Sequence, residues 1–124
     1  MSEQGEALKE RTKQFALDVT QLLELLPNRE TAIVIKRQLA KSATSIAANY
    51  RAARRARSHA EFTARIATVA EEADESLFWL DFISESRLVI SPELSRLQRE
   101  AAELTAIFSA CVRTARRNAL VKRR

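Results

Sequence analysis

The chain has 124 residues with one glycine and two prolines, which is enough for one domain, residues 1–124, and too few helix breakers for a loop-rich fold. Hydrophobic residues make up 46% and charged residues 30%, which excludes a disordered chain, and no apolar run is long enough to span a membrane. The net charge is +5, and the lone Cys111 cannot close an intrachain disulfide. Together with the polar, acidic N-terminal segment, this indicates a cytoplasmic protein.

Four apolar seams, each repeating at alternating steps of three and four residues, predict four amphipathic helices. The first two seams are Leu8, Thr12, Phe15, Val19, Leu22 and Leu26, then Ile35, Leu39, Ser42, Ile46, Asn49, Ala53 and Ala56. The last two are Phe62, Ile66, Val69, Ala73, Ser76, Leu80 and Ile83, then Leu94, Leu97, Ala101, Leu104, Phe108, Cys111 and Ala115. They place helices at about residues 5–26, 29–57, 59–87 and 92–119, followed by a basic C-terminal tail.

Helix-capping signals separate the seams. Asn28 is expected to cap the second helix, and Ser58 with Glu61 fits a capping box for the third. Ser91 followed by Pro92 opens the fourth. Because the connections are short, consecutive helices pack antiparallel, so we expect an all-α, antiparallel up-down-up-down four-helix bundle.

Two groups of residues exceed what a monomeric bundle needs. One is a stripe of small residues on the second helix, Ala40, Ala43 and Ala47. The other comes from "LFWLDFI" on the third helix, which leaves Phe78, Trp79 and Phe82 on faces other than the core. Exposed aromatic rings at this density indicate a subunit interface; the alternative is overlap with the edge of the core.

The sequence offers little catalytic chemistry, so we expect no enzyme activity, no cofactor and no metal. Di-iron bundles use Glu-x-x-His motifs, whereas the only histidine, His59, starts the third helix. Cys111 falls on a core seam with no second histidine to activate it. The only glycine, Gly5, cannot form a phosphate-binding loop.

An acidic cluster on the third helix has a plainer explanation than catalysis. Its members are Glu71, Glu72, Asp74 and Glu75. We expect them to face basic groups, either Arg37 and Lys41 of the second helix or groups of a neighbouring subunit.

Three polar residues, Ser42, Ser45 and Asn49, lie on or beside the second seam. Buried polar groups need hydrogen-bond partners. These residues either bond the preceding helical turn or form a network with the third helix that fixes the register of the two helices. The sequence leaves both open.

The segment from Gln38 to Ile83 carries a family pattern. Its elements are Gln38, Ser45-Ile46, Asn49, Ser58, Phe62, Ala70, Glu72, Glu75 and an aromatic-leucine end. The pattern resembles small bacterial four-helix-bundle proteins whose founding members are encoded in intervening sequences of large-subunit ribosomal RNA genes. Many members have Glu-Gly shortly after the asparagine, whereas this chain has the more basic "YRA". The outer helices match only by length and period.

The resemblance implies a ring-like homo-oligomer, a pentamer. A related branch, the accessory proteins of diversity-generating retroelements, consists of basic pentamers that bind nucleic acid and the reverse transcriptase. The resemblance carries over no catalytic residue.

Positive charge is concentrated in two blocks. Residues 29–57 carry eight Lys/Arg against one Glu, and residues 91–124 carry eight against three, whereas residues 58–90 are acidic. One or two arginines suit a helix C-terminus, but the first block ends with four, Arg51, Arg54, Arg55 and Arg57. Arg37 and Lys41 share the face of Arg51 and Arg55. We expect Arg113, Arg116, Arg117 and the terminal "VKRR" to form a second basic region at the opposite pole.

These features favour a non-enzymatic oligomer that binds nucleic acid, preferably RNA, through phosphate contacts made by arginines on a helix. Tyr50 either stacks on a base or packs at the end of the bundle. The alternative function is a protein–protein adaptor, such as an accessory subunit of a reverse transcriptase, without nucleic-acid binding of its own. No membrane partner is expected.

Overall fold

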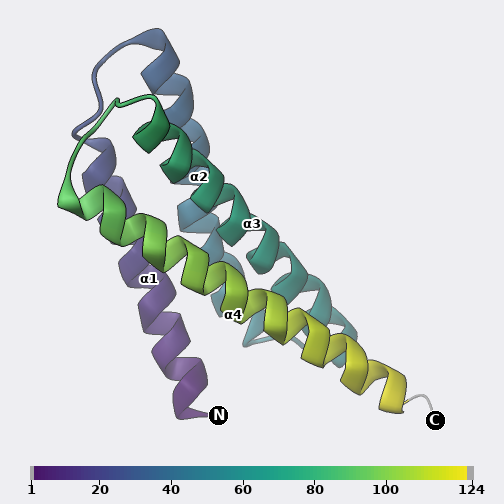
Figure 1. Ribbon diagram of the computed structural model, residues 1–124. Helices are drawn as coiled ribbons and strands as arrows, with labels where there is room; N and C mark the ends of the chain where they lie inside the picture. The colour runs from purple at the N-terminus through teal and green to yellow at the C-terminus, as the bar shows by residue number, and fades with distance from the viewer. Residues whose placement is uncertain (1, 123–124) are drawn as a thin grey trace.

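The computed structural model describes residues 2–122, with side chains up to residue 120, as four helices without a strand. These are α1 (Glu3–Leu23), α2 (Glu30–Ala53), α3 (His59–Glu85) and α4 (Pro92–Lys122). Residues 123–124 and the side chains of 121–122, part of the expected basic tail, lie outside this description. Successive helices lie side by side, whereas α1 and α4 diverge from the end where α1 stops and α4 begins (Figure 1). The predicted all-α class is confirmed.

Hydrogen bonds between helices establish their directions. Asn49 of α2 bonds Glu72 of α3, and Ser42, earlier in α2, meets Ser76, later in α3. A residue earlier in one helix thus meets a residue later in the next, which requires antiparallel packing. The ion pairs Arg11–Glu100 and Asp18–Arg96 show the same order for α1 and α4. The arrangement fits the expected up-down-up-down bundle.

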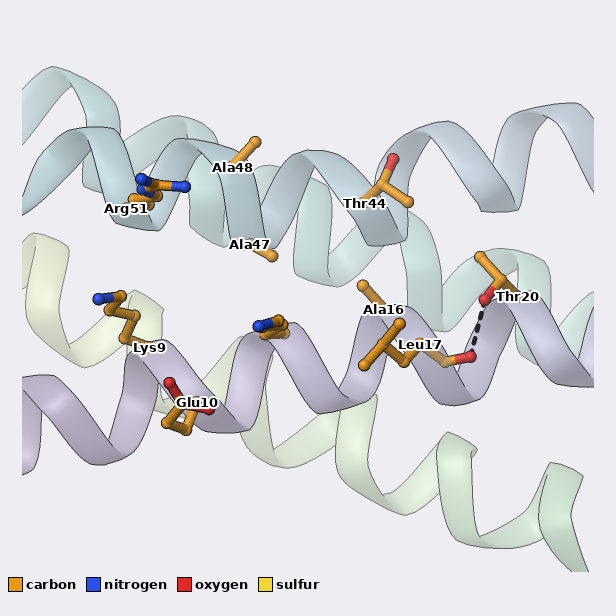
Figure 2. A pocket seen from close by; sticks show the side chains of 10 residues that line it. Lys9, Glu10, Ala16, Leu17, Thr20, Thr44, Ala47, Ala48 and Arg51 are labelled. Carbon is orange, nitrogen blue, oxygen red and sulfur yellow. Dashed lines mark hydrogen bonds between the residues drawn. The ribbon is translucent and has the colours of Figure 1, made fainter.

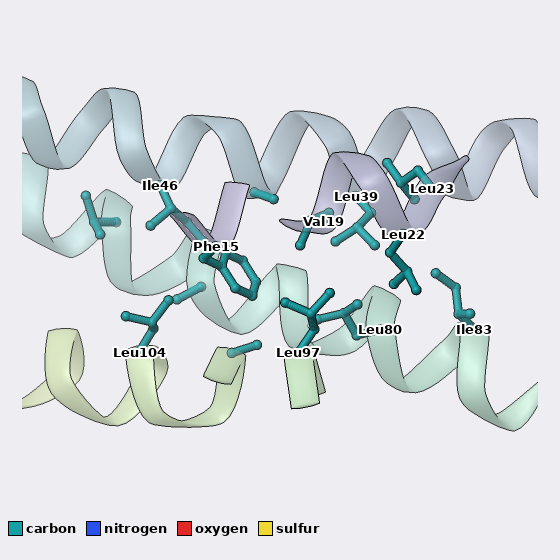
Figure 3. Close-up of a cluster of buried hydrophobic side chains, with 14 of the residues drawn as sticks. Phe15, Val19, Leu22, Leu23, Leu39, Ile46, Leu80, Ile83, Leu97 and Leu104 are labelled. Atoms are coloured by element: carbon teal, nitrogen blue, oxygen red, sulfur yellow. The ribbon is translucent and has the colours of Figure 1, made fainter. Parts of the chain in front are cut away.

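Large apolar side chains from all four helices fill the core (Figure 3). Every member of the four predicted seams is buried or half-buried. The fully buried side chains include Phe15, Val19, Leu22, Leu39, Ile46, Ile66, Leu80, Leu97, Leu104 and Phe108. Burying one such Leu, Ile or Phe is worth about 1.5–3 kcal/mol, so the seams are the main source of stability.

The serine caps predicted for α3 and α4 are confirmed, but the Glu61 side chain of the expected capping box accepts from the N–H of Arg57 rather than from that of Ser58. The backbone N–H of Glu61 donates to Ser58 Oγ at 3.0 Å at the start of α3. The N–H of Leu94 donates to Ser91 Oγ at 3.2 Å at the start of α4. The predicted cap at Asn28 is wrong, because α2 starts one residue later with Arg29 in the capping position and no capping side chain.

The helix ends also differ from the predicted ones. Helix α1 ends at Leu23 rather than residue 26, because tight turns follow it while Leu26 stays in the core. Helix α2 ends at Ala53 rather than Arg57, and α4 continues to Lys122. Within residues 2–122, no helix combines the length and the apolar character that crossing a membrane requires.

Candidate functional site

The four arginines that close the first basic block do not share one helix. Helix α2 ends at Ala53, and the next residues form tight turns in which the N–H of Arg55 donates to the carbonyl of Ala52 at 3.0 Å. Ser58 then caps α3. Only Arg51 therefore lies within α2, whereas Arg54, Arg55 and Arg57 belong to the turn. The expectation of arginines on a helix is corrected for these three.

Arg54 is turned inward. Its side chain is only 9% exposed, and its Nη1 lies 3.0 Å from Glu6 Oε1 in the first turn of α1. An acidic residue in the first turn of a helix is itself favoured by the helix dipole. Arg54 therefore joins the end of α2 to the start of α1 and does not present its charge to solvent.

Arg51, Arg55 and Arg57 are exposed. They line a hollow of about 470 Å³ together with Ala48, Ala52, Glu61 and Arg65. The carboxylate in this hollow is already engaged, because Glu61 accepts from the N–H of Arg57 at 2.9 Å and from Arg65 Nε at 3.3 Å. These two bonds lower the pKa of Glu61, the backbone bond most. Glu61 therefore stays ionised while it secures the turn.

The outer face of α2 continues this positive surface. Arg37, Lys41 and Arg51 follow the spacing of one helical face, Arg55 lies in the turn just beyond it, and all four are exposed. No acidic residue occurs between Arg37 and Arg55. The stripe therefore carries unmixed positive charge.

The second basic block lies at the same end of the bundle as the first, which corrects the expectation of an opposite pole. His59 Nε2, at the start of α3, lies 2.8 Å from the carbonyl oxygen of Ala115, near the end of α4. Since α2 and α4 run in the same direction, their C-terminal ends lie at the same end of the bundle. Exposed side chains of Arg113, Arg116 and Arg117 are thus brought to the end that carries the turn arginines. We call this end, with Arg51, Arg55, Arg57, Arg113, Arg116 and Arg117, the basic pole.

Tyr50 packs inside the bundle. Its side chain is 6% exposed, its ring centroid lies 5.2 Å from that of Phe108, and its hydroxyl donates a long hydrogen bond to the carbonyl of Gly5 at 3.4 Å. Burial raises the pKa of Tyr50. Of the two roles expected for Tyr50, packing inside the bundle is therefore the one observed, and its ring is not exposed for stacking on a base.

The polar residues of the second seam form a network with α3. Ser76 Oγ donates to Ser42 Oγ at 2.9 Å, while Ser42 also donates to the carbonyl of Leu39 at 3.3 Å. Asn49 Nδ2 donates to Glu72 Oε1 at 2.9 Å, and Ser45 also bonds that carboxylate. Of the two explanations left open by the sequence, the interhelical network holds, with one additional local bond at Ser42.

The acidic cluster does not pair with α2 in the expected way. Glu72 meets an amide and a hydroxyl rather than a cation. Glu71, Asp74 and Glu75 are exposed, and no ion pair among the described residues joins them to Arg37 or Lys41. In residues 2–122, no three His, Cys, Asp or Glu side chains are grouped so that they could hold a metal ion.

The aromatic residues of α3 form an exposed cluster at the end opposite the basic pole. Phe78 is 56% and Phe82 43% exposed. Trp79 is half-buried, with its ring centroid 4.9 Å from that of Phe78 and 6.0 Å from that of Phe82. Its Nε1 is buried and has no hydrogen-bond partner among the described residues.

The small residues of α2 divide between core and surface. Ala43 is 0% exposed and belongs to the core, whereas Ala40 and Ala47 are half-buried. Ala47 lines a hollow between α1 and α2. Cys111 also packs partly against the core, and burial raises the pKa of its thiol, which disfavours the nucleophilic thiolate.

Sequence reasoning missed two lysines of the positive surface. Lys9 and Lys13 of α1 line the hollow of about 530 Å³ between α1 and α2, where Arg51 also lies. Figure 2 shows Lys9 and Arg51 at the same end of this hollow, on facing helices. Their spacing of four residues was the available signal, but it gives no indication of which helix they face.

A family model for the 23S rRNA-intervening sequence protein matches residues 7–110. The chain belongs to the 23S rRNA-intervening sequence protein family. The search among curated proteins gave no match.

Among solved structures, a similar one is a protein of unknown function from the S23 ribosomal protein family of Bacteroides thetaiotaomicron. It shares 25% sequence identity with a TM-score of 0.76, and the match covers 84% of this chain and 96% of that chain. The four-helix arrangement is thus shared with another protein of this kind, and the resemblance inferred from Gln38 to Ile83 is confirmed.

Proposed function

We propose that this 23S rRNA-intervening sequence family member is a non-enzymatic, oligomeric bundle that binds nucleic acid, preferably RNA, through the basic pole. The observation that carries the proposal is the convergence of both basic blocks at one end, where His59 meets Ala115. Six arginines of the basic pole, from α2, the following turn and α4, are exposed and would be available to one bound nucleic acid. Arginine suits phosphate because its planar fork donates two parallel hydrogen bonds.

The proposed assembly is a homo-oligomer, a pentamer as the family resemblance implies. Exposed Phe78 and Phe82 beside half-buried Trp79 supply apolar surface for a subunit contact. A ring would repeat the basic pole once in every subunit, so a long polyanion could bind several copies at once. Weak individual phosphate contacts would then add up to strong binding.

A second candidate is a protein–protein adaptor, such as an accessory subunit of a reverse transcriptase. The same aromatic cluster favours it, because this cluster could cover another protein instead of a second copy. In that case the basic pole would only keep the bundle soluble.

Fluorescence anisotropy with a labelled RNA at increasing salt separates the two. For phosphate-dominated binding, we expect log Kd to depend steeply on log salt, and Arg51→Gln with Arg55→Gln to weaken binding to all sequences alike. The matched control is Arg29→Gln with Arg99→Gln, which removes the same charge from exposed positions near the opposite end. Absence of RNA and DNA binding at low salt would favour the adaptor.

A further inference from the structure

Two hollows on the outer face of the bundle meet at α2. The hollow between α1 and α2 and the hollow beside the α2–α3 turn are both lined by Ala48 and Arg51. Since both residues are exposed on α2, the two hollows are neighbouring parts of one surface. This surface extends from Lys9 and Lys13 on α1 to Arg57 before α3.

The surface formed by the two hollows carries a large excess of positive charge. The cations that line the two hollows are Lys9, Lys13, Arg51, Arg55, Arg57 and Arg65, against the two carboxylates of Glu10 and Glu61. Glu61 is occupied by the Arg57 N–H and by Arg65. Among the described residues, no ion pair holds the side chains of the other five cations. Within the part of the chain that the structure describes, the charge of these five side chains is therefore not neutralised by ion pairs.

The side chains between these cations are mostly small. Ala16, Ala47, Ala48 and Ala52 line the hollows, and Leu17 is the one large apolar side chain among their lining residues. Figure 2 shows Ala16 and Leu17 on α1 and Thr44 on α2 at the end of the first hollow away from Lys9 and Arg51. Small side chains let a bulky ligand approach the helices closely.

No aromatic ring lines either hollow among the described residues. Tyr50, the aromatic residue next to Arg51 in the sequence, is buried against Phe108. The exposed rings of Phe78 and Phe82 lie near the other end of α3. The positive surface thus lacks the stacking platform that single-strand-binding proteins combine with basic grooves.

We propose that the two hollows form one phosphate-binding track for double-helical RNA, which passes from Lys9 and Lys13 over Arg51 to Arg55 and Arg57. The inference rests on the proposed nucleic-acid binding and specifies its ligand. Double-helical RNA is bound mainly through its shape, phosphates and 2′-hydroxyls, so it needs no exposed ring. A duplex also brings two phosphate strands to a broad surface, whereas a single strand brings one.

The test compares a blunt RNA duplex with an unstructured oligouridine strand that carries the same number of phosphates. Anisotropy is measured for both ligands at the same salt, with the parent chain and with Lys9→Gln combined with Lys13→Gln. Glutamine keeps helix propensity, and circular dichroism checks that the variant folds. Arg29→Gln with Arg99→Gln is again the charge-matched control.

For the parent chain, we expect duplex Kd values at least tenfold lower than those for the single strand. The lysine variant should lose duplex affinity, and the magnitude of its salt slope should fall by roughly 0.9 per lost phosphate contact, the value for duplex DNA. Equal or tighter binding of oligouridine would overturn the proposal. Unchanged duplex binding by the folded lysine variant would overturn the track. Absence of binding to either ligand would instead contradict the proposed function itself.

Discussion

Glu72 carries a partly buried carboxylate where α2 and α3 meet. Burial raises its pKa above the ordinary value of 4.5, and hydrogen bonds from Asn49 and Ser45 oppose this shift only in part. Between 4.5 and the raised value, the folded chain holds a proton that the unfolded chain has lost. The free energy of unfolding therefore falls as pH rises through this window.

Glu72→Gln removes this titration and keeps a side-chain oxygen that can accept from Asn49. We expect the stability of the variant relative to the parent to increase as pH rises from about 4 to about 7. Urea unfolding at several pH values measures this difference. Asp74→Asn, at an exposed position on the same helix, is the control and should leave the pH dependence of the parent largely unchanged. Parallel pH curves for parent and Glu72→Gln would contradict the argument.

Arg54 and Arg55 are adjacent in the sequence, but only Arg54 is expected to matter for stability. Arg54→Gln breaks the ion pair with Glu6 that joins α2 to α1, and should lower the free energy of unfolding by about 1–2 kcal/mol. Arg55→Gln, at an exposed position, should change it by less than about 0.5 kcal/mol. Thermal unfolding of both variants measures the contrast, and equal losses would argue against a specific role for Arg54.

At the scale of elements, the end of α3 is closed by a left-handed residue. The N–H of Leu88 donates to the carbonyl of Ile83, and that of Arg87 to Ser84, which is the hydrogen-bond pattern of a Schellman motif. Arg87 occupies its left-handed position with φ 56°. Glycine is usual there, because a Cβ atom in this conformation costs roughly 1–2 kcal/mol.

Arg87→Gly should therefore stabilise the chain, by about 0.5–1 kcal/mol after the larger backbone entropy of glycine in the unfolded state is subtracted. Arg87→Ala keeps the Cβ atom and is the matched control, for which no such gain is expected. Differential scanning calorimetry of the two variants compares them directly. A gain for alanine equal to that for glycine would trace the effect to the lost charge.

The helices and two of their caps were predictable because their causes are local. Ser58 and Ser91 each bond an N–H three residues later, so residue type and spacing were sufficient. The cap at Asn28 failed because tertiary packing decides where α2 starts. Leu26 and Ala32 are both buried, and the link between these anchors places Arg29 at the start of the helix.

The candidate site was less predictable, because its residues come from distant parts of the chain. Arg54 pairs with Glu6, which lies 48 residues earlier in the chain. No local sequence pattern indicates this contact. Lys9 and Lys13 meet Arg51 only because α1 lies beside α2. The shared location of the two basic blocks, in contrast, follows from topology: in an up-down-up-down bundle the second and fourth helices run the same way. The predicted topology was therefore enough to place both basic blocks at one end, and the expectation of an opposite pole was wrong.

At the scale of the whole molecule, the two ends of the bundle differ in chemistry. Arginines gather at the basic pole, whereas Phe78, Trp79 and Phe82 lie toward the end of α3 away from it. An interface through the aromatic cluster would leave the basic pole free in every subunit. Assembly and nucleic-acid binding can therefore be separated by mutation.

We expect Phe78→Ser with Phe82→Ser to shift the protein from a homo-oligomer to monomers, because the substitutions remove the largest exposed aromatic area of the bundle. Size-exclusion chromatography with light scattering measures the mass of both proteins at micromolar concentration. Leu120→Ser, which changes an exposed apolar residue near the basic pole, is the control and should leave the mass unchanged.

The monomeric variant should still bind RNA, but with a shallower salt dependence, since each particle then carries one basic pole instead of several. A parent protein with the mass of a single chain would refute the assembly, and an oligomer that survives both serine substitutions would move the interface to another face.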